Sequence, residues 1–237
     1  MNKKNKQNVT ILIDTAIQKI RIENPGTEIN QKSISEDTGL TPKTLVTYNK
    51  GFNSNSLSVV KYLMDNKHLS PLQHISFGFK IETRRSISAQ IFRHRSLNGQ
   101  EWSLRYSEPL GFEDIELRKE HPNNRQSSTE VFDPLIADNI EASKVIEMFL
   151  LSAESLYEEL IKAGVAKECA RDVLPLCTKT TIHITGTLRD LLGFLNVRCD
   201  EHAQKEIKDI ANRIGEELEK ELPEIMSTID WRNGMFL

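Results

Sequence analysis

The sequence predicts a single α+β domain, and three observations lead to this fold class. Apolar residues alternate with polar or small residues over 75–81, which is the period of a half-buried strand. Apolar residues recur at helical spacing over 145–160, as in an amphipathic helix. No internal repeat and no Pro-, Gly- or Ser-rich linker divides the chain into halves. We therefore expect one domain over residues 1–237, with an atypical insertion at about 23–46.

The N-terminal part begins with a short strand and continues into turn-rich sequence. Residues 9–14 are apolar and partly β-branched, which favours a strand, and residues 15–22 continue with helix-like spacing. The insertion at 23–46 contains the turn-forming pair Pro25-Gly26 and a short polar helix candidate. Residues 56–66 again place apolar side chains at helical spacing. This part therefore predicts one strand and two helices outside the insertion.

The rest of the chain alternates between strand and helix patterns. Each element is predicted from its apolar period and from the turn residues that bound it. The elements in order are a strand over 75–81, a helix over 86–93, a polar surface loop over 111–134, a long helix ending at Gly164, a helix over 167–174, a strand over 180–186, a helix over 188–196 and an amphipathic helix over 201–222.

Composition restricts the class of protein. The chain is 38% hydrophobic, which is enough for a substantial core, and its formal charge of -3 provides no general attraction for nucleic acid. We expect no membrane span, because the longest apolar runs are far shorter than the roughly 20 residues that a bilayer requires. The N-terminus lacks the apolar stretch of a signal peptide, and three cysteines form no even disulfide framework. We therefore expect a cytoplasmic protein.

Arginine is concentrated in three separate segments. Arg93, Arg95 and Arg105 lie within residues 92–108, and two later segments add Arg171, Arg189 and Arg198. Guanidinium groups bind phosphate through paired hydrogen bonds and stay charged at neutral pH. Because the whole chain is slightly acidic, this local concentration indicates a pocket for an anionic ligand such as a nucleotide phosphate.

The sequence "RHRSLNGQEWS" fits the pattern Arg-His-Arg, seven residues, Ser, and this pattern is the signature of the flavin-dependent thymidylate synthases. Four motifs occur in the order that the family has. They are "HLSPLQH", "SAQIFRHRSLNGQEWSLRYSE", "AKECARDVLPL" and "LRDLLGFLNVRCDEHAQ". The chain resembles that family from about Thr47 to about Gln204, whereas the insertion at 23–46 has no counterpart that we can assign.

This resemblance implies a fold, a reaction and an assembly. The implied fold is a mostly antiparallel sheet flanked by helices. The implied reaction makes dTMP from dUMP, with FAD as cofactor and with methylenetetrahydrofolate and NADPH as co-substrates. The implied assembly is a homotetramer whose active sites lie at subunit interfaces, with no nucleic acid or membrane as partner. The absence of GxGxxG and Walker motifs agrees with a nucleotide site outside the Rossmann and P-loop folds.

The resemblance also assigns roles to residues at matching motif positions. Catalytic roles are implied for Arg198, Ser103 and His68, with Arg198 set against the uracil ring. The implied dUMP-binding residues are Gln90, Arg93, Glu101, Ser103, Arg105, Arg171 and Arg198, of which Arg105 and Arg171 hold the phosphate. The implied flavin-binding residues are Thr47, His68, Ser70, Gln73, Arg93, His94, Arg95, Arg189, Asn196 and His202.

Four positions depart from the family pattern. Gln73 replaces a usual Glu and Gln100 replaces a usual Asn, while Thr187 and Gly193 stand where Asn is frequent. Glycine has no side chain that could bond a cofactor. These departures leave open a second reading, a catalytically impaired homologue that binds flavin and nucleotide without turnover.

Other functions fit the same residues less well. His68 and His74 lack a carboxylate or cysteine at a supporting spacing, so no metal site is expected. Residues 29–51 resemble a helix-turn-helix with a turn at Gly39, but they lack a strong basic face, which makes a DNA-binding regulator the weaker alternative. Cys177 follows Pro175 by two residues, a setting in which a free cysteine usually packs as a small hydrophobe. We expect no covalent role for it.

Overall fold

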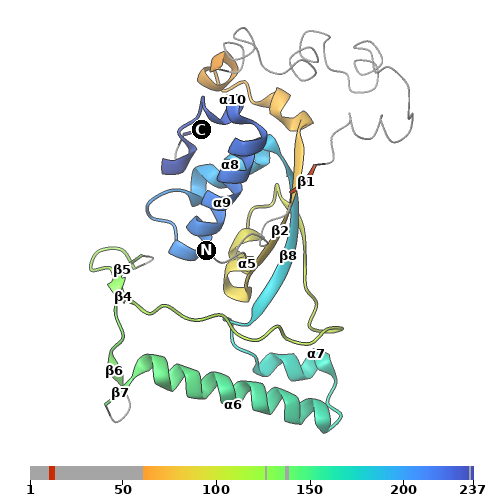
Figure 1. The fold of residues 1–237 in the computed structure, drawn as a ribbon, viewed down its shortest axis with the longest axis vertical. Helices are drawn as coiled ribbons and strands as arrows, with labels where there is room; N and C mark the ends of the chain where they lie inside the picture. The colour runs from red at the N-terminus through yellow and green to blue at the C-terminus, as the bar shows by residue number, and fades with distance from the viewer. Residues whose placement is uncertain (1–10, 14–60, 126, 137–138, 235) are drawn as a thin grey trace, which may run out of the picture. The chain divides into compact units, whose positions relative to one another are not determined.

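A computed structural model describes residues 11–13, 61–125, 127–136, 139–234 and 236–237 of the chain (Figure 1). Their contacts divide them into two compact units. The first unit comprises the described residues of 80–184 and 202–208, and the second comprises 11–13, 61–79, 185–201 and the described residues of 209–237. The insertion at 23–46, the helix expected over 15–22 and the flavin-binding candidate Thr47 lie outside the described residues. The single-domain organisation stays a prediction.

A four-stranded sheet has the strand order β1-β2-β8-β3. β1 (Ile11–Ile13) pairs antiparallel with β2 (Ser76–Arg84), so that Ile13 lies opposite Phe77. In β8 (Lys179–Thr187) buried residues alternate with less buried ones, and the sheet ends at β3 (Asn98–Glu101). Both long strands confirm the predictions at 75–81 and 180–186, and β1 confirms the strand expected near the N-terminus. The mixture of helices and antiparallel strands agrees with the α+β class.

The first unit contains the long helix and three short helical turns. α5 (Arg85–Ile91) and α6 (Ala142–Lys162) confirm the helices predicted over 86–93 and before Gly164. The predicted helix over 167–174 divides into α7 (Lys167–Ala170) and the 3-10 turn η3 (Arg171–Val173), which both contact α6. Figure 1 shows α7 lying along the C-terminal part of α6.

The prediction that the polar segment 111–134 is a surface loop is wrong in part, because the segment contains a β-hairpin. It was expected to be a loop, yet β4 (Arg118–Glu120) pairs antiparallel with β5 (Ser128–Val131). A second small pair joins β6 (Leu135–Ile136) and β7 (Ile140–Glu141) ahead of α6. Every residue of β5 is exposed, so this strand has no buried face and therefore no apolar alternation that could reveal it.

The second unit is built around α8 (Leu188–Arg198), which contacts the 3-10 turns η2 (Ser70–His74) and η4 (Trp231–Asn233). A capping box starts α8, because the Thr187 side chain accepts from the Asp190 N–H while the Asp190 carboxylate accepts from the Thr187 N–H. Residues 61–65 are helical, as predicted within 56–66.

The C-terminal helices complete this unit. α9 (Lys205–Glu221) begins four residues later than predicted and has its first four residues in the first unit; α10 (Pro223–Met226) follows it. Gly215 in α9 makes room for Trp231, whose ring lies 2.2 Å from the point that a Cβ at Gly215 would occupy. A larger residue at 215 would displace this fully buried indole.

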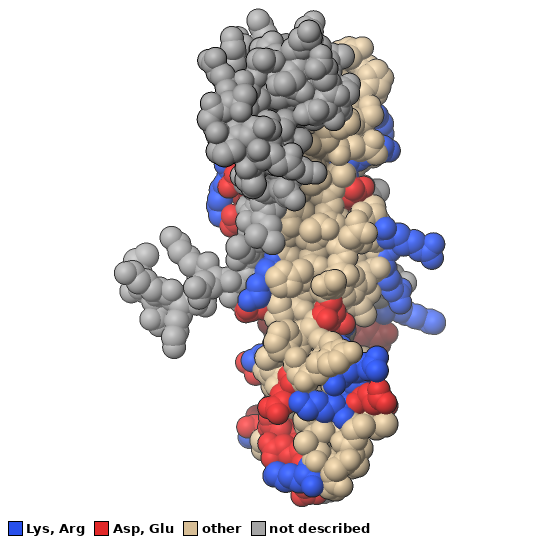
Figure 2. Space-filling view, turned by 90° about the vertical axis from the view of Figure 1, so that its right-hand side faces the viewer, with Lys and Arg blue, Asp and Glu red and all other residues tan. Residues whose placement is uncertain are grey.

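The described surface carries both signs of charge and several exposed apolar side chains. On the face drawn in Figure 2, Lys and Arg lie among Asp and Glu, with broad areas of other residues between them. Several large apolar side chains of α6 and of the segment before it are exposed, among them Val131, Leu135, Met148, Phe149 and Leu151. None of the helices in the described part of the chain is long and apolar enough to cross a membrane.

Candidate functional site

The two predicted phosphate ligands lie close together in the first unit, although they are 66 positions apart in the sequence. Arg105 Nη2 lies 3.2 Å from the Glu168 carboxylate, and Arg171 Nε donates to the Glu168 carbonyl oxygen at 3.2 Å. Arg105 lies near the end of the second motif, whereas Glu168 and Arg171 belong to α7 and η3. The turn from α7 into η3 therefore brings the two guanidinium groups to one residue. Glu168 belongs to this candidate cluster, and the sequence analysis did not identify it.

The Arg-His-Arg motif lies just beyond the end of α5, which stops two residues before the predicted boundary at 93. α5 ends at Ile91 with Phe92 as its C-cap, and Arg93 and Arg95 are both exposed. The backbone N–H of Arg93 donates to the Gln90 carbonyl oxygen at 3.3 Å, which closes the last turn. Neither guanidinium forms an ion pair with another described residue. Both remain available to an anionic ligand.

Glu101 is held in a fixed position by groups from α5. Ser88 Oγ donates to Glu101 Oε1 at 2.7 Å, and Arg85 Nη1 lies 3.4 Å from Glu101 Oε2. Arg85 Nη2 also donates to the Trp102 carbonyl oxygen at 2.8 Å, which fixes the end of β3. Gly99 is required in β3, because a Cβ there would lie 2.4 Å from the Phe92 ring and 3.1 Å from the His183 carbonyl oxygen. Glu101 is therefore a preorganised hydrogen-bond acceptor.

Gln90 contacts a residue that lies 114 positions later in the sequence. Its Nε2 donates to Gln204 Oε1 at 2.7 Å, and Gln204 Nε2 donates to Glu206 Oε2 at 2.9 Å. Glu206 Oε1 in turn lies 2.9 Å from Arg84 Nη2 and 2.9 Å from Arg118 Nη2. Gln204 was noted in the sequence within the fourth motif but given no role, and Glu206 was not singled out.

The Glu206 carboxylate is kept ionised by this environment. Burial raises the pKa of Glu206, but hydrogen bonds from its own backbone, from Gln204 and from Arg118 outweigh burial, so the pKa lies below its ordinary value. The side chains of Arg84, Arg118 and Glu206 are 9%, 12% and 18% exposed. Water therefore screens these contacts much less than it screens an ion pair on the open surface.

The remaining predicted site residues of the first unit are His94, Ser103 and His202. The surroundings of the Ser103 hydroxyl bear on its proposed role. Ser103 Oγ accepts from the Arg105 backbone N–H at 3.4 Å. Among the described residues, no His or Lys side chain contacts this hydroxyl, so it has no base that would make it a nucleophile. Its position beside Arg105 agrees with a hydrogen-bonding role.

The second unit holds the other predicted residues that the structure describes. His68 packs edge-on against Tyr62 with ring centroids 6.1 Å apart, and Ser70 and Gln73 belong to η2. Asn196 Oδ1 accepts from the Leu237 backbone N–H at 2.7 Å, so its side chain also holds the C-terminal residues. Three residues of this group lie on α8, namely Arg189, Asn196 and Arg198.

Gly193 can be tested directly, because a Cβ there would meet nothing within 4 Å. We expect Gly193→Ala to raise the free energy of unfolding by about 0.5–1 kcal/mol through helix propensity alone. Gly193→Asn restores the residue that is frequent in the family and should tighten flavin binding by roughly 2- to 10-fold, the strength of one added hydrogen bond. Flavin titration of both variants separates the two effects. An equal affinity in both would remove residue 193 from the flavin site.

Cys177 is buried at 6% exposure, as predicted for a small hydrophobe. Burial raises the pKa of its thiol, and this outweighs the lowering by its own backbone and by Arg84. The thiol therefore stays protonated at neutral pH, in contrast to the thiolate that a cysteine nucleophile needs. The structure thus gives no support to covalent attack by Cys177.

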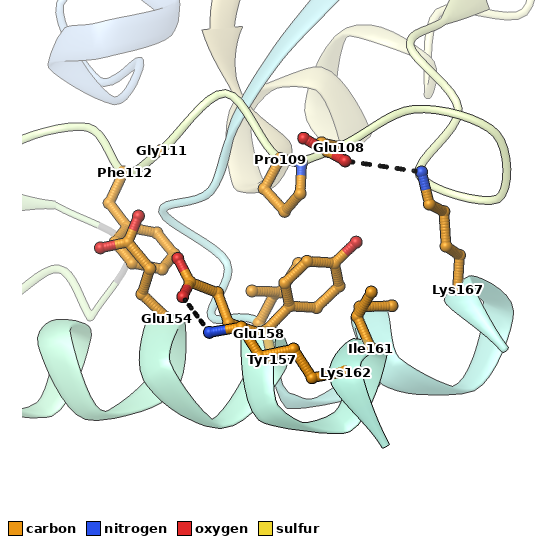
Figure 3. A pocket seen from close by; sticks show the side chains of 11 residues that line it. Glu108, Pro109, Gly111, Phe112, Glu154, Tyr157, Glu158, Ile161, Lys162 and Lys167 are labelled. Atoms are coloured by element: carbon orange, nitrogen blue, oxygen red, sulfur yellow. Dashed lines mark hydrogen bonds and ion pairs between the residues drawn. The ribbon is translucent and has the colours of Figure 1, made fainter. Parts of the chain in front are cut away.

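A pocket of about 290 Å³ in the first unit is lined on one side by Glu108, Pro109, Gly111 and Phe112 (Figure 3). Figure 3 shows the Tyr157 side chain reaching from α6 toward the ion pair of Glu108 and Lys167, whose charged atoms are 4.0 Å apart. Lys167 Nζ also donates to the Tyr106 carbonyl oxygen at 3.4 Å. These contacts attach α7 to the segment that carries Arg105. Within the described residues, no group of three or more His, Cys, Asp or Glu side chains is arranged to hold a metal ion.

Comparison with known proteins identifies the family. A sequence model of the family described as "Thymidylate synthase complementing protein" matches residues 10–224. The chain is 35% identical over 181 residues to the flavin-dependent thymidylate synthase of Synechocystis sp., covering 76% of this chain and 82% of that protein. It is 32% identical over 214 residues to a probable flavin-dependent thymidylate synthase of Paramecium bursaria Chlorella virus 1, covering 89% and 87%.

A third relative agrees with these two. The flavin-dependent thymidylate synthase of Thermosipho melanesiensis is 31% identical over 194 residues, which cover 80% of this chain and 84% of that protein. All these matches extend over most of both chains. The family model's match over residues 10–224 includes the four ordered motifs. The chain therefore belongs to the flavin-dependent thymidylate synthases, a class of methyltransferases.

Proposed function

We propose that this enzyme converts dUMP to dTMP with FAD as cofactor, methylenetetrahydrofolate as one-carbon donor and NADPH as reductant. The observation that carries the proposal is the approach of Arg105 and Arg171 to Glu168. Two guanidinium groups from separate segments meet at one place, which suits the doubly charged phosphate of a nucleotide. A bound phosphate would take the place of the Glu168 carboxylate at Arg105.

The residues present also fit a flavin dinucleotide. Arg93, Arg95 and Arg189 are exposed, and none of their guanidinium groups forms an ion pair with another described residue. Such unpaired cations suit the negative diphosphate of FAD. The residues that would hold FAD are those that match the family's flavin positions: His68, Ser70, Gln73, Arg93, His94, Arg95, Arg189, Asn196 and His202, with Thr47 outside the described residues.

The chain's own residues then act on dUMP by binding and electrostatics. Arg105 and Arg171 hold the phosphate, and the fixed Glu101 carboxylate accepts hydrogen bonds from the nucleotide. Arg198 stabilises negative charge that develops on the uracil oxygens when C5 becomes nucleophilic. Reduced FAD, when bound, supplies the hydride. No step requires a protein nucleophile, in agreement with the buried Cys177 and with Ser103.

One pair of measurements tests the proposal against a binding homologue without turnover. Purified protein should show the flavin absorbance bands near ~370 and ~450 nm that the cofactor itself dictates. Chemically reduced protein mixed with dUMP and methylenetetrahydrofolate should then yield dTMP in a single turnover. Flavin without dTMP would identify a catalytically impaired homologue, and absence of both would refute the proposed function.

We further propose a homotetramer with active sites at its subunit interfaces. α6 supports this assembly because it carries apolar side chains on two faces. Ala153 and Tyr157 are buried within the first unit, whereas Met148, Phe149 and Leu151 are 52%, 57% and 61% exposed. A helix that is apolar on both faces is usually buried on both. Other copies of the chain would cover the exposed face.

Cys177→Ala should retain dTMP formation within about tenfold, a margin of ~1.4 kcal/mol that allows for lost packing. The reason is that the thiol is protonated and buried, so it contributes volume and no chemistry. Single-turnover conversion with chemically reduced enzyme is the measurement, since NADPH oxidation then cannot mask the chemical step. Complete loss of product in a folded, yellow Cys177→Ala protein would revive a covalent mechanism.

A further inference from the structure

We propose that Gln204 and Glu206 are positioning residues that determine which atom of the Gln90 amide faces the nucleotide. This inference rests on the proposed function, in which Gln90 binds dUMP. It assigns a direction to the hydrogen bond between Gln90 and dUMP. Gln90 accepts through its carbonyl oxygen Oε1, and the group of dUMP that contacts it is a donor.

The argument starts at Glu206, because an ionised carboxylate can only accept hydrogen bonds. The Gln204 side chain reaches Glu206 Oε2 at 2.9 Å, so the atom facing Glu206 must be Nε2. The opposite side of that amide is then its oxygen. Gln204 Oε1 lies 2.7 Å from the Gln90 amide and requires a donor, which fixes Nε2 of Gln90 on this side. One charge therefore sets the orientation of two successive amides.

The carboxylate that starts this chain cannot easily turn away. Arg118 donates through Nη2 to both Glu206 oxygens, at 2.9 and 3.0 Å, and Arg84 Nη2 lies 2.9 Å from Oε1. Arg118 is itself fixed by Glu116 at 2.9 Å and by Ser128 Oγ at 3.0 Å. Ser128 belongs to β5, so the exposed hairpin contributes to holding the charge.

This orientation predicts what Gln90 recognises. A glutamine amide carries an acceptor on one side and a donor on the other, and a site that cannot reverse it discriminates between ligands. dUMP has two groups that can donate, the imide N–H of uracil and the 3′-hydroxyl of deoxyribose. A ligand that lacks the donor contacted by Gln90 would leave Oε1 without that partner. The chain thus acts on specificity as well as on affinity.

Two analogues and one variant test the specificity. N3-methyl-dUMP lacks the imide donor, and 2′,3′-dideoxy-UMP lacks the hydroxyl donor. At least one of them should bind wild-type protein about tenfold or more weakly than dUMP, and Gln204→Met, which keeps length without polarity, should reduce that penalty to within about twofold. If Gln204 had a merely structural role, Gln204→Met would weaken the binding of all three ligands by the same factor. The ratio of analogue affinity to dUMP affinity would then stay unchanged.

A charge swap provides the rescue. In Gln204→Glu/Glu206→Gln the carboxylate at 204 accepts from Gln90, and the amide at 206 donates to it while its oxygen faces the arginines. This double variant should restore the wild-type analogue penalty to within about threefold. The matched control is Lys205→Gln, which removes the outer ion pair to Glu116 at 2.7 Å and leaves the amide chain in place. It should keep the wild-type penalty.

A measurement without ligand separates this inference from the proposed function. Gln90→Met and Gln204→Met should each lower the melting temperature. The sum of these two losses should exceed the loss in the double variant, because the two residues share one hydrogen bond. Additive losses would overturn the chain whatever the protein binds. If the protein forms dTMP but Gln204→Met does not change the analogue penalty, only this inference is overturned. Failure of wild-type protein to bind dUMP would overturn both the proposed function and the role of Gln204 in recognition.

Discussion

Arg171→Ala or Arg105→Ala should weaken dUMP binding by about 2 to 4 kcal/mol, which is roughly 30- to 700-fold, while leaving the flavin content unchanged. The reason is that each guanidinium supplies charge-assisted hydrogen bonds to the phosphate. Both groups already lie within 3.2 Å of Glu168, so little rearrangement is needed to bind an anion there. Calorimetric titration of the yellow protein with dUMP measures the effect.

Deoxyuridine and Arg125→Ala are the controls for this assignment. Deoxyuridine lacks the phosphate, so it should bind all forms of the protein weakly and should not distinguish the two variants from wild type. Arg125 is an exposed arginine of the first unit outside the four motifs, and its loss should leave dUMP affinity within about twofold. Equal binding of dUMP and deoxyuridine to wild-type protein would show that the phosphate is not bound by these arginines.

Phe149→Glu should dissociate the assembly and thereby abolish dTMP formation. The substitution places a charge on the exposed apolar face of α6, and burying an unpaired charge in an interface costs several kcal/mol per copy. Folding of the single chain should survive, since Phe149 is 57% exposed within it. Light scattering reports the assembly, circular dichroism the fold and single-turnover assays the activity.

Glu147→Gln is the matched control on the same helix. It alters the charge of an exposed polar residue two positions away and leaves the apolar side chains in place. This variant should remain a tetramer with wild-type activity. If Phe149→Glu also remained tetrameric and active, the apolar face of α6 would have no role in assembly.

The sequence allowed prediction of the elements that have one buried and one less buried face. β8 alternates along its length, and α9 buries Ile207, Ala211, Ile214 and Leu218 at helical spacing. The hairpin of β4 and β5 was missed because its stability does not come from a buried apolar face. Arg118 instead pairs with Glu206 across 88 residues, which no local pattern records.

The candidate site shows the same limit. Residues of the Arg-His-Arg motif were identified because the motif is contiguous, although the helix predicted over 86–93 ends at Ile91, before Arg93 and Arg95. The meeting of Arg105 with Glu168 depends on a turn between α7 and η3. The orientation of Gln90 depends on the charge of Glu206, to which it is linked through the Gln204 amide. Such relations are properties of the folded arrangement and leave no signature in residue order.

The contrast between the two tryptophans has a spectroscopic consequence. Trp102 is 42% exposed and lies in the motif segment, whereas Trp231 is 1% exposed and packs against Gly215 in the second unit. Indole emission shifts to the red in water and to the blue in an apolar environment, so the two contributions differ in wavelength. A ligand at the motif segment should alter the red contribution of Trp102, and only unfolding should move the blue contribution of Trp231. Unlabelled protein thus reports nucleotide binding and loss of the C-terminal core through two separable fluorescence signals.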